Sequence, residues 1–124
     1  GPNMTSKPPA YVRAAARGLT EAGAGLVAGH SAHVFHGVSG TVLFDLGEFV
    51  DDYAVDERLR NDLGLLFLVT LDDDGPERLE VVPLAVGFCH TRLAEPARRP
   101  GCVAGSCARV RSSVPRRSSP GRGG

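Results

Sequence analysis

The sequence has no apolar run long enough to cross a membrane. A spanning helix needs about 18 or more apolar residues in succession, whereas the longest run here, at 65–71, is the length of a strand and is interrupted by Thr70. Near the N-terminus, Lys7 is followed by Pro8 and Pro9 instead of an apolar stretch, so we expect no secretory signal there. We therefore predict no membrane span, and the sequence assigns the chain to no compartment.

Cysteines and common catalytic motifs are also scarce. The three cysteines, Cys89, Cys102 and Cys107, are an odd number and give no disulfide framework. Cys102 and Cys107 lie close enough in the chain for a metal site, but no second pair completes a tetrahedral one. No Gly-x-Ser-x-Gly elbow, P-loop or dinucleotide fingerprint occurs. A non-enzymatic binding or interaction module is therefore the main competitor to an enzyme.

The neutral formal charge conceals two segments of opposite sign. Residues 1–95 contain all fourteen acidic residues and seven basic ones, whereas residues 96–124 contain seven arginines and no acid. This second segment is rich in Arg, Ser, Pro and Gly and lacks apolar periodicity, which predicts a disordered basic tail. No aromatic residue follows Phe88, so the tail lacks the side chains on which bases stack, and we expect no nucleic-acid partner.

The apolar pattern before the tail predicts one α/β domain over residues 10–95. Residues 1–9 form a leader, whose first two residues resemble the scar of a cleaved expression tag. Apolar residues with helical spacing then continue to Gly23, which predicts a helix that ends there. A short apolar strand at 25–28 leads into a polar loop. A helix, a strand and a polar loop in this order are typical of α/β folds that carry functional loops at strand ends.

Three further strands are expected along the chain. The segment TVLFDL at 41–46 is a short candidate, and the Leu-, Val- and Phe-rich segment at 63–71 is a strong one. The segment at 78–86 alternates partly and should form a hairpin with it, through a loop of four to six residues around Asp72 to Pro76. Pro83 predicts either an edge strand or the end of regular pairing at that point.

The loop Gly29-His30-Ser31-Ala32-His33 contains the residues best suited to chemistry. Two imidazoles three residues apart can approach one metal ion or two neighbouring ions, each through one ring nitrogen. We expect Gly29 to allow a sharp turn after the strand. By spacing alone such a histidine pair is more often accidental than ligating. His36 could extend the cluster, although a solvent-exposed histidine is its simpler interpretation.

Several segments in order resemble the poly-gamma-glutamate capsule synthesis (CapA) family. They are AGLVAGHSAHVFHGV, TVLFDLGEFV, VDDYAVDERLRNDLGLLFLVTL and RLEVVPLAV, and together they cover residues 10–95. The resemblance implies the C-terminal portion of a calcineurin-like metallophosphoesterase domain with α/β/β/α layers. It also implies hydrolytic chemistry at a two-metal site (Zn, Mn or Fe), in which His30 and His33 are metal ligands.

The family's remaining metal-site motifs should precede His30, and none of them is found there. We therefore expect a fragment with an incomplete site, no assignable catalytic residue and no activity alone. Glu48 stands where the family usually has Asn or Asp, and its default interpretation is a surface loop acid. The alternative function is a non-enzymatic module that self-associates through an exposed sheet edge. Its partner would be a second copy or the missing N-terminal part of the domain.

Overall fold

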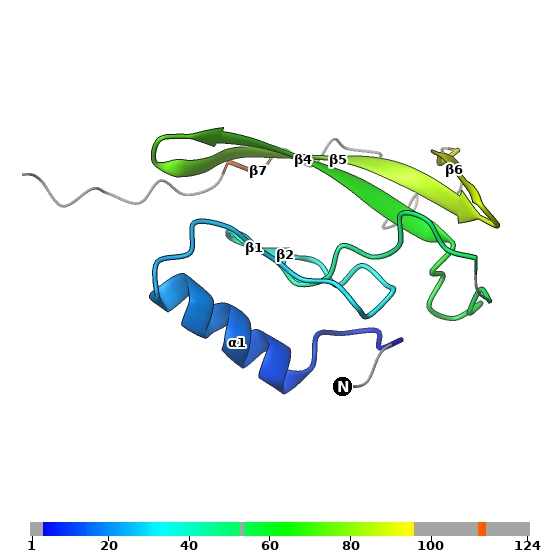
Figure 1. The fold of residues 1–124 in the computed structure, drawn as a ribbon, viewed down its shortest axis with the longest axis horizontal. Coiled ribbons are helices and arrows are strands. Elements are labelled where there is room, and N and C mark those ends of the chain that lie inside the picture. Colours follow the sequence, from blue (N-terminus) through cyan, green and yellow to red (C-terminus); the bar gives the residue numbers. More distant parts are fainter. Residues whose placement is uncertain (1–3, 53, 96–111, 114–124) are drawn as a thin grey trace, which may run out of the picture.

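The computed structural model describes residues 4–52, 54–95 and 112–113 of the 124-residue chain. A helix, a small sheet and a long β-hairpin lie in succession from the bottom to the top of Figure 1. This mixed architecture agrees with the predicted α/β class, whereas the metallophosphoesterase layering stays a prediction. No helix among the described residues is long and apolar enough to span a membrane. Residues 1–3 of the predicted leader (1–9) and all of the predicted tail (96–124) except 112–113 lie outside the described residues.

Helix α1 (Ala10–Glu21) confirms the helix predicted from apolar spacing. It ends in a Schellman motif, since Gly23 N–H donates to the Thr20 carbonyl at 3.1 Å and Ala24 N–H donates to the Leu19 carbonyl at 3.0 Å. Gly23 has a φ of 103°, a left-handed conformation that glycine adopts without steric cost. The helix packs on β1 through a face that buries Ala16.

The small sheet contains the two predicted short strands. Strand β3 lies in the centre, parallel to β1 on one side and antiparallel to β2 on the other. The central strand is the most buried of the three, because both of its residues lie in the core. The bounds are β1 (Val27–Ala28), β2 (Val38–Ser39) and β3 (Val42–Leu43).

The second sheet confirms the predicted hairpin and corrects its loop. Asp72 pairs with Gly75, so the connection has two residues and not four to six. Asp72 Oδ1 accepts a 2.9 Å hydrogen bond from Asp74 N–H, and this side-chain contact stabilises the tight turn. The strands are β4 (Leu63–Asp72), β5 (Gly75–Gly87), β6 (His90–Leu93) and β7 (Ser112–Ser113).

Pro83 ends pairing on one side of β5, as the second of the two predicted alternatives had it. Strand β5 is central, because β4 lies on one edge and β6 and β7 lie on the other. The Pro83 carbonyl accepts a 3.0 Å hydrogen bond from Ala94 N–H, just beyond the last residue of β6. Proline has no N–H, so the β6 ladder cannot continue past it. The alternative of an edge strand is therefore wrong.

An aromatic contact joins the second sheet to the segment that follows the histidine loop. Phe35, in the segment that follows the histidine loop, lies 5.6 Å from Phe67 of β4 between ring centroids, with the rings tilted. Such tilted pairs contribute about 0.5–1.5 kcal/mol beyond the area they bury. This contact places the hairpin against the segment that carries the candidate site.

Candidate functional site

The histidine loop begins at a point where two backbones lie very close together. Gly29 N–H donates to the Leu43 carbonyl at 2.8 Å, and Leu46 N–H donates to the Gly29 carbonyl at 3.1 Å. A Cβ atom at Gly29 would lie 2.2 Å from the carbonyl oxygen of Phe44. Glycine is needed here because of this close approach. The sharp turn was expected at Gly29, but the backbone turns at Ser31 and His33 instead, where φ is positive.

Ser31 and His33 both have positive φ values, of 95° and 63°. Such conformations are uncommon for residues with a side chain, and they persist where surrounding contacts enforce them. The Ala32 side chain between them is buried. The loop is therefore held in a specific strained shape, as is frequent at binding and catalytic sites.

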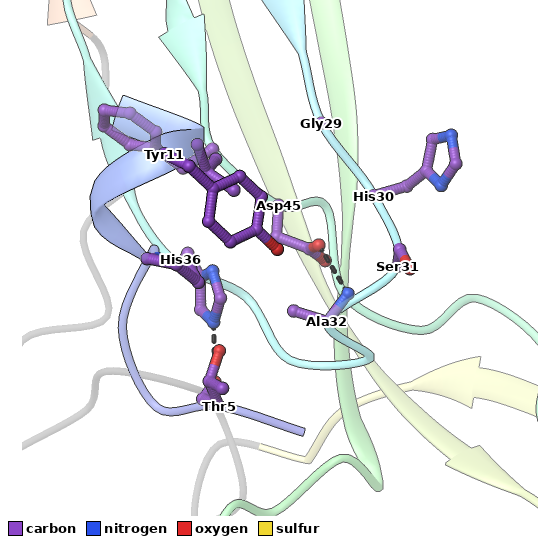
Figure 2. A pocket seen from close by; sticks show the side chains of 11 residues that line it. Thr5, Tyr11, Gly29, His30, Ser31, Ala32, His36 and Asp45 are labelled. Atoms are coloured by element: carbon purple, nitrogen blue, oxygen red, sulfur yellow. Dashed lines mark hydrogen bonds between the residues drawn. The ribbon is translucent and has the colours of Figure 1, made fainter. Parts of the chain in front are cut away.

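Asp45 supplies the contacts that fix this shape. Its side chain is almost fully buried, with a residue exposure of 2%. Its Oδ2 accepts a 2.8 Å hydrogen bond from Ala32 N–H, and its Oδ1 accepts a 2.9 Å hydrogen bond from Gly47 N–H. Figure 2 shows this carboxylate directed at the histidine loop. Sequence reasoning missed Asp45, although an acidic residue inside an apolar strand segment is a signal that could have indicated it.

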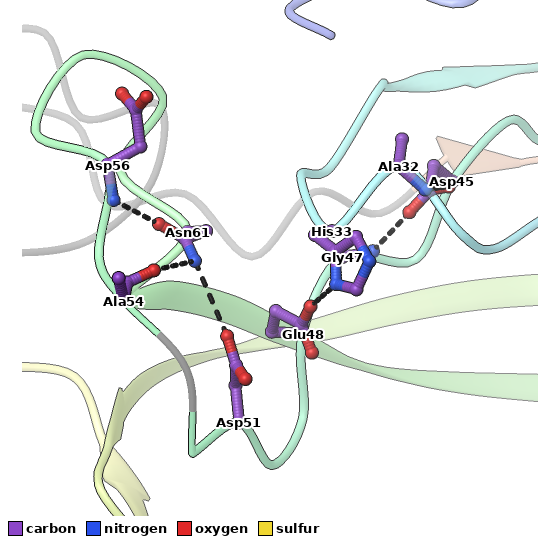
Figure 3. A network of polar contacts seen from close by, with 9 residues as sticks. All are labelled: Ala32, His33, Asp45, Gly47, Glu48, Asp51, Ala54, Asp56 and Asn61. Carbon is purple, nitrogen blue, oxygen red and sulfur yellow. Dashed lines mark hydrogen bonds and ion pairs between the residues drawn. The ribbon is translucent and has the colours of Figure 1, made fainter. Parts of the chain in front are cut away.

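His33 and Glu48 form a direct side-chain pair, in which His33 Nδ1 contacts Glu48 Oε1 (Figure 3). The Glu48 side chain is 13% exposed and the His33 side chain is 40% exposed. The interpretation of Glu48 as a surface loop acid is therefore wrong. The family resemblance indicated a position for Glu48 near a site. The contact with His33 was not predictable, because it joins residues fifteen positions apart in the chain.

His30 is exposed and lines a cavity of about 130 Å³ next to the start of α1. In Figure 2 its ring points away from Tyr11, His36 and Asp45, which line the same cavity. His33 is not among the lining residues. The two predicted ligands thus come from one loop, but their side chains have different surroundings.

His36 is half-buried, which corrects its interpretation as a solvent-exposed residue. Its Nε2–H donates a 2.6 Å hydrogen bond to the carbonyl oxygen of Thr5, which can only accept. Because Nε2 is engaged in this way, His36 attaches the N-terminal segment to the site and does not extend the histidine pair through that nitrogen.

A second polar network lies beside the pair, around the almost fully buried Asn61 (Figure 3). The Asn61 side chain accepts from Asp56 N–H at 2.8 Å and donates to the Ala54 carbonyl at 3.3 Å. Its neighbour Arg60 binds Asp62 through two bonds of 2.6 and 2.8 Å, which raises the pKa of Arg60. These contacts give the loop before β4 a defined shape, and they favour a structural role for this segment.

The donor chemistry of the loop fits a divalent metal, but the number of donors does not complete a site. Glu48 gives one ring nitrogen of His33 a carboxylate partner, which is one of the partners that metal-binding histidines have on their second nitrogen. However, no group of three or more His, Cys, Asp or Glu side chains in the described part of the chain could hold one ion. A mononuclear catalytic site needs about three protein ligands.

Residues 1–53 match the family model of the bacterial capsule synthesis protein PGA_cap. The family resemblance is confirmed over this stretch. The match covers less than half of the 124 residues, and it includes the whole histidine loop together with Asp45 and Glu48. The family match connects residues 1–53 with bacterial capsule synthesis at the level of the family. Searches of curated proteins and of solved structures gave no match.

Proposed function

We propose that this chain acts in bacterial capsule synthesis as part of a CapA-like protein of metallophosphoesterase fold, and that it binds a divalent metal ion through His30 and His33. The observation that carries the proposal is the family match over residues 1–53, which contains both histidines. The strained loop and the paired carboxylate of Glu48 support it further.

The proposed activity of this chain is metal binding without hydrolysis, because two histidine ligands are too few for a catalytic site. Two imidazoles bind a divalent ion weakly, and zinc more tightly than manganese because imidazole affinity rises along the divalent series from manganese toward copper. Iron is the third candidate ion. When bound, such an ion would act as a Lewis acid. The contribution of this chain is to hold the two histidines on one rigid loop.

Calorimetric titration with Zn²⁺ and Mn²⁺ tests the proposal. The double variant His30→Ala/His33→Ala should lose zinc binding, whereas His90→Ala should keep it, since His90 is an exposed histidine at the start of β6. Equal zinc binding by the double variant and the wild type would assign the ions to other residues and reject the proposed site.

A specific observation favours self-association as a second candidate function. Strand β4 pairs with β5 on one edge, and no strand in the described ranges pairs with its other edge. From Leu63 to Leu71 it contains no charged residue and no proline, the features with which proteins usually protect an edge strand. Leu66 and Leu68 are also 37% and 48% exposed on the sheet face.

The pairing of Leu65 with Pro83 identifies the backbone groups at this open edge. Pro83 directs its carbonyl toward Ala94, away from β4, so the Leu65–Pro83 pair is of the non-hydrogen-bonded type. The N–H and carbonyl of Leu65 therefore face the open edge, and those of Phe67 and Val69 do so by alternation. Three residues in one strand thus offer backbone groups to a partner.

A second copy of the chain can pair with these backbone groups symmetrically. In an antiparallel pair about a two-fold axis at Phe67, Leu65 lies opposite Val69 of the second copy and Leu66 lies opposite its Leu68. All these contacts are apolar. The formal charge of the whole chain is zero, so no net repulsion opposes association. We propose this antiparallel β4 pair as the self-association mode.

Light scattering over a concentration series tests the self-association. Leu68→Lys should shift the chain toward monomer, because it brings a charge into an apolar pair, whereas Leu93→Lys at an exposed position on β6 should not. The register has its own test. Leu66→Lys and Leu68→Glu should each weaken self-association, and a mixture of the two should restore it through opposed charges. A wild-type chain that stays monomeric at all concentrations would reject this candidate.

A further inference from the structure

The His33–Glu48 pair has a role that the family match does not assign. We infer that Glu48 is a positioning residue that holds His33 in the Nδ1–H tautomer, and that Asp45 sets the geometry of this pair. The inference rests on the proposed function in one respect, namely that the Nε2 of His33 is the nitrogen offered to a metal ion. The tautomer itself can be tested without metal.

The tautomer follows from the contact between the two side chains. His33 Nδ1 lies against Glu48 Oε1. An ionised carboxylate can only accept hydrogen bonds, so Nδ1 carries the proton of the neutral ring and Nε2 carries the lone pair. The His33 side chain is 40% exposed, whereas the Glu48 side chain is 13% exposed. The carboxylate therefore forms the inner end of the pair, and the ring extends toward solvent.

Asp45 fixes both members of the pair through their neighbours in the chain. Its two carboxylate oxygens accept from the backbone N–H groups of Ala32 and Gly47, which immediately precede His33 and Glu48. A single buried side chain therefore sets the separation of the two loops at the point where the pair forms. Because both of these hydrogen bonds go to backbone N–H groups, Asp45 acts on the pair through the backbone.

Strand β4 supports Glu48 from the other side. A Cβ atom at Gly64 would lie 2.2 Å from the Glu48 carbonyl oxygen, so the strand and the Glu48 backbone are in close contact. The φ of 63° at His33 is consistent with a ring whose direction is imposed by its surroundings. These contacts together make the pair a preorganised unit and not a chance surface contact.

The test reads the histidine ring nitrogens of the metal-free chain by long-range proton–nitrogen NMR, at about pH 8.5, roughly two pH units above the ordinary histidine pKa. The His33 signals are identified by their loss in His33→Ala. Wild type should show the Nδ1–H form. Glu48→Ala should revert His33 to the Nε2–H form that free histidine prefers. Glu48→Gln should retain the Nδ1–H form, because its amide oxygen still accepts, and the exposed Glu57→Gln serves as a matched control.

Zinc titration of the same variants adds a second readout. Loss of an orienting partner typically weakens metal affinity about 10- to 100-fold, so Glu48→Ala should show such a loss and Glu48→Gln a smaller one. An Nε2–H form in the wild type, or an unchanged Nδ1–H form in Glu48→Ala, would overturn the inference. Failure of zinc binding with a correct tautomer would instead overturn only the proposed metal function.

Discussion

The backbone N–H of Ala32 donates a 2.8 Å hydrogen bond to Oδ2 of Asp45, thirteen residues further along the chain. The second oxygen of this carboxylate accepts from Gly47 N–H. Hydrogen bonds to a charged group contribute roughly 1.5–3 kcal/mol each, and a buried group that loses its partner is costly. One almost fully buried side chain therefore connects the histidine loop to the segment that carries Glu48.

Asp45→Ala should lower the free energy of unfolding by about 3 kcal/mol, because a buried and a partly buried N–H group lose their acceptor. Asp45→Asn should cost less, since its amide oxygen still accepts one of the two bonds. Urea denaturation followed by circular dichroism measures both. Asp73→Asn, in the exposed hairpin turn, is the control and should change stability by less than about 0.5 kcal/mol. Equal stability of Asp45→Ala and wild type would contradict this role.

Gly29→Ala and Gly18→Ala should have opposite effects on stability. At Gly29 the added Cβ would lie 2.2 Å from the Phe44 carbonyl oxygen, so the two backbone segments must move apart, at a cost of about 1–3 kcal/mol. At Gly18, inside α1, an added Cβ meets nothing within 4 Å and should stabilise the helix by roughly 0.5–1 kcal/mol. Thermal unfolding of the two variants provides the comparison. An unchanged stability of Gly29→Ala would mean that these two backbone segments move apart easily.

The segment around Asp56 should lose order at low pH. Its carboxylate accepts from Leu59 N–H at 2.9 Å and from Arg58 N–H at 2.8 Å, and these bonds lower the pKa of Asp56. A lowered pKa means that the stabilisation is fully present above about pH 4, the ordinary range of aspartate. It is lost as the pH falls through the lower pKa of the folded state.

Amide NMR signals of Arg58 and Leu59 provide the measurement for this pH dependence. They should stay constant from neutral pH down to about pH 4 and shift below it, whereas in Asp56→Asn they should show no such transition. A midpoint above the ordinary aspartate value in the wild type would contradict the assigned hydrogen bonds.

Local sequence signals were sufficient for the helix and for the long hairpin. Apolar spacing ending at Gly23 specified α1, and the uncharged run at 63–71 specified β4, because both patterns depend on neighbours in the chain. The hairpin loop was predicted too long, because the whole Asp-rich cluster was assigned to it. In the structure Asp72 already pairs with Gly75, and its side chain accepts from Asp74 N–H inside the turn. The sequence could not decide whether Pro83 lies in an edge strand or ends regular pairing. The pairing of β6 with β5 decided between these two alternatives.

The candidate site was predictable only in part, because its contacts join distant residues. The histidines were evident from their spacing and from the family resemblance. The partners that orient the loop, Asp45 and Glu48, lie thirteen and fifteen residues from the groups they bind. The sequence alone does not show whether a carboxylate faces solvent or accepts a hydrogen bond from a backbone N–H. The folded arrangement was therefore needed to distinguish a surface acid from a buried acceptor.

The chain alone should hydrolyse a chromogenic phosphodiester no faster than background, with either Mn²⁺ or Zn²⁺ added. A mononuclear catalytic site needs about three ligands, and a two-metal site needs donors that hold both ions. The resemblance supplies His30 and His33. Other donors nearby are engaged, since both oxygens of Asp45 accept from the backbone and Glu48 contacts His33.

Purified chain should be assayed beside His30→Ala/His33→Ala, with zinc binding measured on the same samples. We expect zinc binding by the wild type and background hydrolysis by both proteins. Metal-dependent turnover that disappears in the double variant would refute the ligand count. It would mean that Asp45, Glu48 or Asp51 leaves its present contacts to complete a working site, which the matching Ala variants could then identify. Turnover retained in the double variant would indicate a contaminating hydrolase, because both proposed ligands are absent from it.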